Sequence, residues 1–291
     1  MRLALKYAIT FAAILLAVHT AQSFPSLHVK RQNPSDLEVS GALAGLPPDS
    51  VRYITREELL AMPQVSFSAS GDTNFSGPTR IRGVRLEDLG RALGASPSSD
   101  MVVAICDDEY RANYPQAYLK AHHPVLVLEV NGKAPAGWPK DSQEHKYDMG
   151  PYMVSNPKFA PSYKILSHTD EQQIPWGVVR IEFRDEKTVF DAITPRGPHA
   201  QDREVQNGFR IVKQNCFRCH NSGREGGQKS GQSWDVLSAL AQFSPNDFAA
   251  YIHSPVGRNA KAQMPGFSDY DDATLAALTS YFQTFSKQGK P

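Results

Sequence analysis

The sequence predicts an α+β protein, in which a β-rich mixed N-terminal domain is followed by an all-α C-terminal domain. Two observations predict this division. Runs rich in β-branched residues, typical of strands, are confined to the first two thirds of the chain, and the signals in the last third are helical. A stretch with Pro and Gly, Thr194 to Pro198, separates the two regions. The length of 291 residues fits two domains, which we place at residues 37–185 and 201–291, with a linker at 186–200.

The composition is that of a globular protein, with 41% hydrophobic and 21% charged residues. The formal net charge is +1. A charge this balanced gives no support for binding to nucleic acid or to an anionic membrane surface. Any protein partner must therefore be recognised by a local patch.

The N-terminus has the pattern of a secretory signal. Arg2 and Lys6 form a basic start, an apolar run covers Tyr7 to Val18, and small residues follow in Ala21-Gln22-Ser23. The run is shorter than the about 20 apolar residues that a membrane anchor needs. No Cys stands at the cleavage point and no Arg-Arg pair precedes the run, so neither a lipid anchor nor the twin-arginine route is indicated. We expect residues 1–23 to be removed, which predicts a periplasmic protein without stable membrane insertion.

The N-terminal domain follows a polar linker at residues 24–36. Thr55 and Glu58 form a capping-box pattern that predicts a short helix, and a second helix is expected over Leu86 to Leu93, before Gly94. Asn131-Gly132 predicts a tight turn. The strand candidates are the β-branched runs Met101 to Ile105, Val125 to Val130 and Val178 to Phe183.

The segment Cys216-Phe217-Arg218-Cys219-His220 has the Cys-x-x-Cys-His pattern. Two thiols three positions apart lie on one helical turn and can add to the two vinyl groups of a haem, and the next His is then presented to the iron. A thioredoxin-like motif would not need the His, and a compact zinc site would need ligands closer than His253. The pattern predicts one covalent haem c, with thioether bonds from Cys216 and Cys219 and with His220 as the proximal iron ligand.

The second iron ligand is expected from a distant loop. Met264 stands in a polar Met-Pro-Gly segment, which is poorly explained as core packing, and a thioether ligand suits electron transfer. His253 is the alternative, but it lies in a predicted helix that begins at Phe248. We therefore predict Met264 as the distal iron ligand.

Helical patterns frame this site. One covers Arg203 to Gln214, and another covers Asp272 to Phe285 with apolar residues at helical spacing. Gly208 in the first helix would let the two helices approach closely. Residues 201–291 resemble a single-haem class I cytochrome c, which implies transfer of single electrons to or from a redox partner protein. The matching segments are Gly208-Phe209, Tyr251 to Pro255, Met264 to Phe267 and Leu278 to Phe282.

One departure from the family concerns the segment after the haem motif. The family usually has Gly-Pro-x-Leu there, and the Pro carbonyl orients the proximal His. This chain has Gly231-Gln232-Ser233-Trp234, and the Gln232 carbonyl could orient His220 instead. Trp234 has two readings, as a contact of the haem edge or a propionate, or as ordinary core packing.

The N-terminal domain resembles the molybdopterin-binding domain of the sulfite oxidase family. The family's molybdenum-ligating Cys falls in the stretch that is Ser66 to Thr79 here, and this stretch has no Cys. We read Cys106 as a small buried apolar residue. With the twin-arginine signal also missing, we expect no molybdopterin. The matching segments are Leu37 to Gly41, Leu59 to Val65, Arg82 to Leu89, Val125 to Gly132, Gly150 to Val154 and Trp176 to Phe183.

Other candidate residues carry weaker signals. We read His122-His123 as a surface turn and the acidic trio Asp107, Asp108 and Glu109 as a solvated loop. His168 receives no role.

Three functions remain. The first is a periplasmic monohaem cytochrome, acting as an electron carrier or as the redox subunit of an oxidoreductase, whose N-terminal domain docks a dehydrogenase or a terminal acceptor; this is an electron-transfer protein rather than a self-contained enzyme. The second is a haem-containing molybdopterin oxidoreductase of the sulfite dehydrogenase type, against which the missing Cys counts. The third, ranked last, is a haem sensor in which Met264 ligation is lost.

Overall fold

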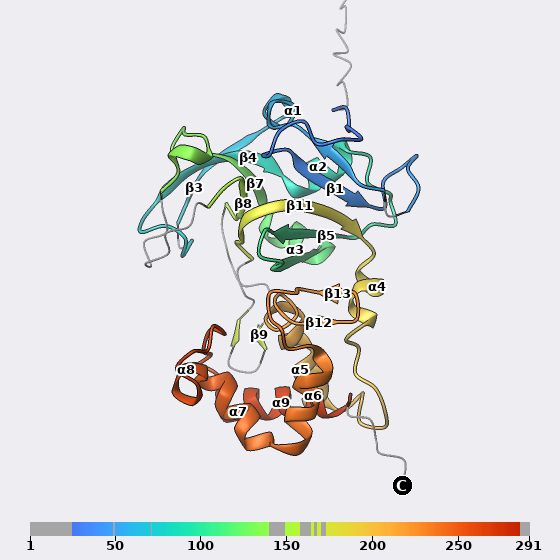
Figure 1. Cartoon of the computed structure of the whole chain (residues 1–291), viewed down its shortest axis with the longest axis vertical. Coiled ribbons are helices and arrows are strands. Elements are labelled where there is room, and N and C mark those ends of the chain that lie inside the picture. The colour runs from blue at the N-terminus through green and yellow to red at the C-terminus, as the bar shows by residue number, and fades with distance from the viewer. Residues whose placement is uncertain are drawn as a thin grey trace, which may run out of the picture.

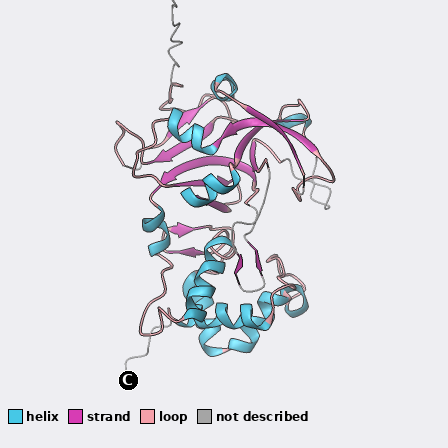
Figure 2. Cartoon of the chain, turned by 180° about the vertical axis from the view of Figure 1, so that it is seen from behind, coloured by secondary structure: helices cyan, strands magenta, loops and turns pink. Residues whose placement is uncertain are grey.

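The computed structural model describes residues 25–48, 50–70, 72–139, 149–157, 164–165, 168–169 and 173–285. The expected signal peptide, residues 1–23, lies outside them. Figure 1 shows a sheet half above and a helical half below, and the view from behind in Figure 2 shows the same division. The fold class is therefore α+β, as predicted. Within the described ranges, no helix is both long and apolar enough to cross a membrane.

The sheet half is built on nine strands. Their order is β2-β1-β11-β8-β7-β4-β3, and β5 pairs with both β11 and β6. The pair β1 and β11 is parallel, whereas the other pairs are antiparallel. Three expected strands are confirmed as β5, β7 and β11. The bounds are β1 Leu37–Gly41, β2 Arg52–Ile54, β3 Val65–Ala69, β4 Thr79–Arg85, β5 Met101–Cys106, β6 Arg111–Pro115, β7 Val125–Val130, β8 Tyr152–Ser155 and β11 Trp176–Arg184, with the separate pair β9 Lys164–Ile165 and β10 His168–Thr169.

Short helices cover this sheet. Thr55 and Glu58 form the expected capping box, and Asn131 and Gly132 form the expected turn, both with positive φ. The apolar residues between the sheet and these helices form a sheet core, which includes Leu37, Ile54, Leu59, Leu86, Leu126, Tyr152 and Phe183. The helices are α1 Arg56–Ala61, α2 Leu86–Ala92 and α3 Gln116–His122, with a 3₁₀ turn at Pro135–Gly137.

The helical half contains both helices predicted around the haem motif, as α5 and α9. It also contains a short hairpin, β12 and β13, where we expected no strand; two residues per strand are too few for a sequence pattern. The bounds are α5 Arg203–Gln214, β12 Asn221–Ser222, β13 Glu225–Gly226, α6 Trp234–Phe243, α7 Pro245–His253, α8 Pro255–Arg258 and α9 Asp272–Gln283.

The segment between the halves also differs from expectation. Residues 186–200 were expected to be a linker, but they begin with a helix, α4 Glu186–Asp191. Asp185 caps the N-terminus of this helix, because its side chain accepts a 2.7 Å hydrogen bond from the Thr188 backbone amide. The apolar side chains of α4 are buried in a joint core, shared by strand β5 and the helical half. The joint core includes Met101, Val103, Ile105, Val189, Phe190, Ile193, Ile211, Phe217, Trp234 and Phe282.

Gly208 is the point of closest approach between α5 and α9. A Cβ atom there would lie 2.2 Å from the Ala277 carbonyl oxygen and 2.6 Å from the Tyr281 Cβ. No side chain larger than hydrogen fits without moving a helix, as the sequence led us to expect.

Substitution Gly208→Ala should therefore force α5 and α9 apart and lower the free energy of unfolding by about 1–3 kcal/mol, despite the better helix propensity of Ala. Denaturant unfolding measures this change. The control is Gly231→Ala, because nothing lies within 4 Å of a Cβ added there. Equal stability of the two variants would contradict the packing argument.

Candidate haem-binding site

The Cys-x-x-Cys-His turn continues directly from α5. The Cys216 amide donates to the Val212 carbonyl at 3.1 Å, and the His220 amide donates to the Cys216 carbonyl at 3.0 Å. Both thiols are free. Burial raises the pKa of Cys216 to about 12 and also raises the pKa of Cys219. The turn that continues from α5 thus carries two neutral thiols, at positions 216 and 219, and an imidazole at position 220.

His220 is held by a backbone carbonyl. Its side chain is buried, and Nδ1 lies 2.7 Å from the Gln232 oxygen. Burial lowers the pKa of His220, although the bond to Gln232 acts in the opposite direction. A neutral ring that donates from Nδ1 keeps Nε2 free as a metal ligand. The Gln232 carbonyl therefore makes the contact that the sequence suggested.

Met264 lies in the loop between α8 and α9, half-buried, and packs against the same joint core as Cys216. The loop is fixed at its far end, where the Phe267 amide donates to the Ile252 carbonyl at 3.1 Å. The Tyr270 hydroxyl of this loop accepts a 2.6 Å hydrogen bond from the side-chain Nδ2 of Asn215, the residue directly before the haem motif. This tie between the two ligand segments was not foreseen from the sequence.

The structure also places His253, the alternative iron ligand, and Trp234, whose role the sequence left open. His253 is exposed at the end of α7. Trp234 is fully buried, donates to the Tyr281 hydroxyl at 3.2 Å, and contacts the rings of Phe217 and Phe282. Its position favours the reading as core packing.

The thiol, imidazole and thioether side chains of this site fit a haem c. Two thiols share one turn, an imidazole has its outer nitrogen fixed, and a thioether lies on the apolar cluster that holds the turn. Thiols, imidazole and thioether are the side chains that bind and ligate this group in proteins.

The backbone of the haem turn is bonded to an edge of the sheet half. The Arg111 amide of β6 donates to the Arg218 carbonyl at 2.9 Å, and the Gln228 amide donates to the Glu109 carbonyl at 3.0 Å. A Cβ atom on Gly227 would lie only 1.7 Å from the Arg218 oxygen. This close approach was not predicted from the sequence, where the adjacent Gly226 and Gly227 after the haem motif are the one local feature that points to it.

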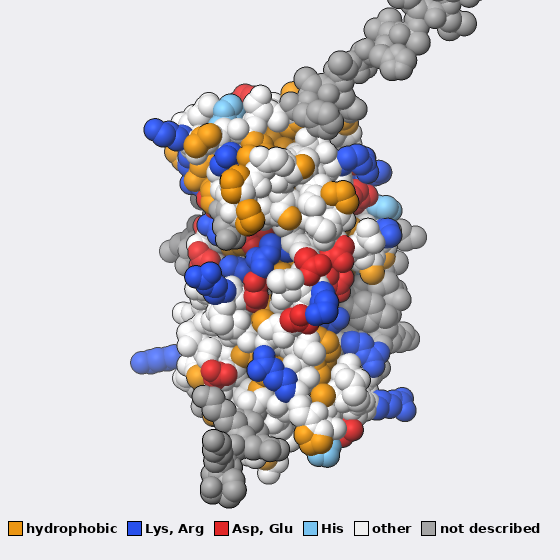
Figure 3. Space-filling model, turned by 90° about the vertical axis from the view of Figure 1, so that its right-hand side faces the viewer, with side chains coloured by type: hydrophobic (Ala, Val, Ile, Leu, Met, Phe, Trp, Pro, Cys, Tyr) orange, Lys and Arg blue, Asp and Glu red, His pale blue; other side chains and the backbone are white. Residues whose placement is uncertain are grey.

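Charged side chains reinforce the contact. Arg184 of β11 reaches Glu225 at 2.5 Å and Glu182 at 3.1 Å, and Arg111 lies 4.0 Å from Glu225. Figure 3 shows charged side chains gathered at mid-height, where the sheet half meets the helical half. The acidic trio at the β5–β6 turn is exposed, as expected, but Asp108 pairs with Lys229 of the helical half.

The remaining candidates lie in the sheet half. Cys106 belongs to the sheet core, and burial and the nearby Asp108 raise the pKa of its thiol. The prediction of a surface turn at His122-His123 is wrong for His122, because α3 extends through this residue. Its side chain is buried, with its ring 4.4 Å from the ring of Tyr118. The side chain of His168 lies outside the described residues. Across the described ranges, no three His, Cys, Asp or Glu side chains gather to hold a metal ion.

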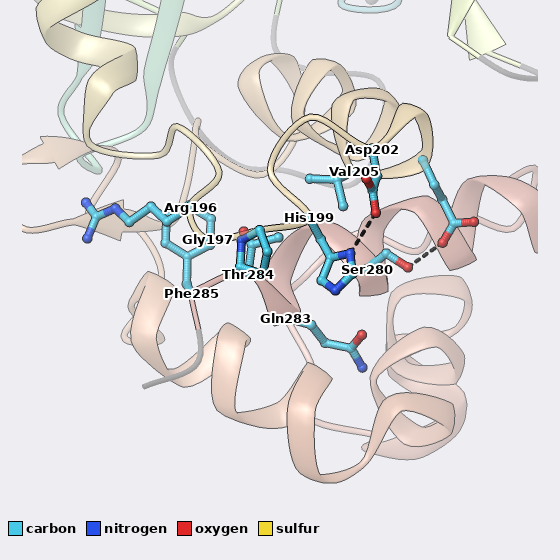
Figure 4. Close-up of a pocket in the computed structure, with 11 residues that line it drawn as sticks. Arg196, Gly197, His199, Asp202, Val205, Ser280, Gln283, Thr284 and Phe285 are labelled. Atoms are coloured by element: carbon cyan, nitrogen blue, oxygen red, sulfur yellow. Dashed lines mark hydrogen bonds and ion pairs between the residues drawn. The ribbon is translucent and has the colours of Figure 1, made fainter. Parts of the chain in front are cut away.

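A separate pocket of about 570 Å³ lies where α5 begins and α9 ends (Figure 4). Its lining includes Arg196, His199 and Ser280, and His199 pairs with Asp202 at 2.9 Å. None of the predicted haem residues lines it.

The comparisons with known proteins bear on the helical half. Residues 203–282 match the family model described as "Cytochrome C oxidase, cbb3-type, subunit III". This segment is a cytochrome c domain. Such a domain implies haem c, electron transfer and a redox partner.

A second comparison covers more of the chain. The crystal structure of the sulfane dehydrogenase SoxCD from Paracoccus pantotrophus is similar at 15% identity, with a TM-score of 0.37. The similarity covers 60% of this chain and 45% of that chain, so the chain spans less than half of that protein. No curated protein matches the chain significantly.

The contribution of the ion pairs between the two halves can be tested through Glu225, which pairs with Arg184 and Arg111. Substitution Glu225→Gln removes the carboxylate that pairs with Arg111 and Arg184 and leaves Arg184 only its pair with Glu182, so it should lower the free energy of unfolding by about 1–3 kcal/mol. The control is Asp191→Asn, which breaks the exposed pair with Lys187 and should cost less than about 1 kcal/mol. Denaturant unfolding gives both values, and similar losses in the two variants would contradict a role for Glu225 in joining the halves.

Proposed function

We propose that this protein is an exported monohaem c-type cytochrome that transfers single electrons, either as a carrier or as the redox subunit of an oxidoreductase. Cys216 and Cys219 hold the haem through thioether bonds, and His220 and Met264 ligate the iron. When bound, the haem supplies a metal that gains or loses one electron. Export rests on the signal pattern in residues 1–23, which also supports a periplasmic location.

The observation that carries the proposal is the hydrogen bond between the His220 side chain and the Gln232 carbonyl. The Gln232 carbonyl lies 2.7 Å from Nδ1. By accepting a hydrogen bond from Nδ1 it fixes the tautomer and leaves Nε2 as the nitrogen that ligates the iron. Tyr270 and Asn215 keep the Met264 loop next to the haem turn. The roles of these side chains are to orient the ligands and to exclude water from an apolar site.

We assign the sheet half, residues 37–185, the role of a docking or binding module for the redox partner, and residues 201–291 the electron-transfer role. The sheet half resembles a molybdopterin-binding domain in several segments. Its stretch from Ser66 to Thr79 has no Cys, and Cys106 is enclosed in the sheet core. Both observations support a module that binds no molybdenum.

Metal and haem content test this proposal. Protein exported together with the haem maturation machinery should contain about one iron and no molybdenum per chain, and its haem should stay on the chain after denaturation. The double variant Cys216→Ala/Cys219→Ala should lose that haem, whereas Cys106→Ala should keep it. Stoichiometric molybdenum in the wild-type protein would favour a sulfite dehydrogenase-type enzyme instead.

The distal ligand is tested by visible spectroscopy of the oxidised protein. A His/Met haem shows a weak band at about 695 nm. Substitution Met264→Ala should abolish this band, and His253→Ala should leave it unchanged, because the His253 side chain points into solvent. The opposite pattern would assign the ligand to His253.

A further inference from the structure

A chain of side-chain hydrogen bonds runs across the haem turn, from the sheet half to the loop that carries Met264. It starts at the Tyr110 hydroxyl, which accepts a 3.1 Å bond from Nη1 of Arg218. Nη2 of the same guanidinium donates to Oδ1 of Asn215 at 3.1 Å. Nδ2 of Asn215 then donates to the Tyr270 hydroxyl at 2.6 Å. Three bonds therefore connect two tyrosines that belong to different halves of the molecule.

The first of these tyrosines is fixed to the sheet half. The Cys106 amide of β5 donates to the Tyr110 carbonyl at 2.9 Å, and the Tyr110 amide donates to the Asp108 carboxylate at 3.1 Å. Burial raises the pKa of the Tyr110 phenol, so its hydroxyl stays neutral. The sheet half therefore offers the haem turn an acceptor in a fixed place.

The second tyrosine restrains the segment that follows Met264. The side chain of Tyr270 is buried, and its ring lies 4.7 Å from the ring of Phe267. The Tyr270 amide donates to the Phe267 carbonyl at 3.1 Å. Because Phe267 stands three residues after Met264, a tyrosine that is held in place limits how far the ligand segment can move.

Arg218 is suited to join the two ends, because a guanidinium is planar and carries five N–H donors in a fixed fork. The residue is half-buried. Its third nitrogen, Nε, donates to the Gln214 carbonyl, so each nitrogen of the fork is engaged. Hydrogen bonds from a charged donor are stronger than neutral ones. Since Arg218 stands between Cys216 and Cys219, the fork belongs to the turn that carries the haem.

The amide of Asn215 transmits the orientation of this fork. Its Oδ1 faces Arg218, so its Nδ2 is turned towards Tyr270. Without Arg218 the amide loses the donor that selects this direction, and its bond to Tyr270 weakens. Hydrogen bonds that are linked in this way strengthen one another, so a loss at one end is felt at the other.

We infer that Arg218 is a positioning residue through which the sheet half keeps the Met264 loop closed on the haem. The inference rests on the proposed ligation of the iron by Met264. Closure of the loop is an equilibrium, and the open state exposes the iron to ligands from solution. Each bond removed from the chain raises the open fraction, and the apparent affinity for an added ligand rises by the same factor.

Imidazole is the probe, because it binds the ferric iron where the thioether has left and so removes the band at about 695 nm. The oxidised, haem-loaded protein is titrated with imidazole. Arg218→Met and Tyr270→Phe should each tighten the apparent binding of imidazole by about three- to tenfold. Tyr110→Phe keeps the ring and removes only the first acceptor, and should tighten the binding by about twofold or more.

The matched control is Arg224→Met. Arg224 is exposed shortly after the haem motif, so this variant loses the same charge without touching the chain of hydrogen bonds. Its imidazole affinity should equal that of the wild-type protein. A tightening as large as that of Arg218→Met would be a general effect of charge and would overturn the inference.

The double variant Arg218→Met/Tyr270→Phe tests whether the two residues act through one connection. Because both changes break the same chain, its imidazole affinity should lie within about twofold of the tighter single variant. Effects that multiply in the double variant contradict the inference. If Arg218→Met does not retain haem, the same comparison is made with Tyr110→Phe, Tyr270→Phe and their double variant.

Failure of the proposed function gives a different result. If Met264 does not ligate the iron, the wild-type protein lacks the thioether band before any imidazole is added. If the band is present and Arg218→Met and Tyr110→Phe bind imidazole like the wild-type protein, only the role of Arg218 is wrong.

Discussion

The turn that carries the haem motif is enclosed on two sides, and its two central residues point in opposite directions. Phe217 is buried in the joint core, whereas Arg218 faces the sheet half, where its guanidinium donates to the Tyr110 hydroxyl at 3.1 Å. The Arg218 carbonyl accepts the Arg111 amide of an edge strand. Because a backbone hydrogen bond and a tight contact at Gly227 act on the same carbonyl, the turn cannot move without breaking both.

The rest of the interface follows from this contact. Strand β5 supplies Met101, Val103 and Ile105 to the joint core, and α4 adds Phe190. Burying one large apolar side chain contributes about 1.5–3 kcal/mol, so the several apolar side chains from β5 and α4 together outweigh the about 1–3 kcal/mol at stake in the pairs of Glu225. The apolar contacts therefore hold the halves together, and the charged residues around Glu225 select the register in which they meet.

The sequence predicted what local patterns determine. The helix from Arg203 to Gln214 has a clear apolar period, and Thr55 has its capping partner three residues away. The features that were missed depend on contacts between distant segments. Helix α4 is short and gains its stability from the joint core, and His122 is buried because α3 packs against the sheet. The Gln232 contact was foreseen because the family pattern supplied a distant constraint that local residues do not contain.

The same contacts decide how the sheet half can act on electron transfer. A flexible linker would let the cytochrome domain search for its partner, with an effective concentration set by linker length. Here the segment after residue 185 is helical and partly buried, and the Tyr281 hydroxyl donates to the Ile193 carbonyl at 2.5 Å. The haem turn therefore keeps one position relative to β6. A partner that docks on the sheet half is then held at a single distance from the haem turn, and the rate of transfer depends on where it docks rather than on a tethered search.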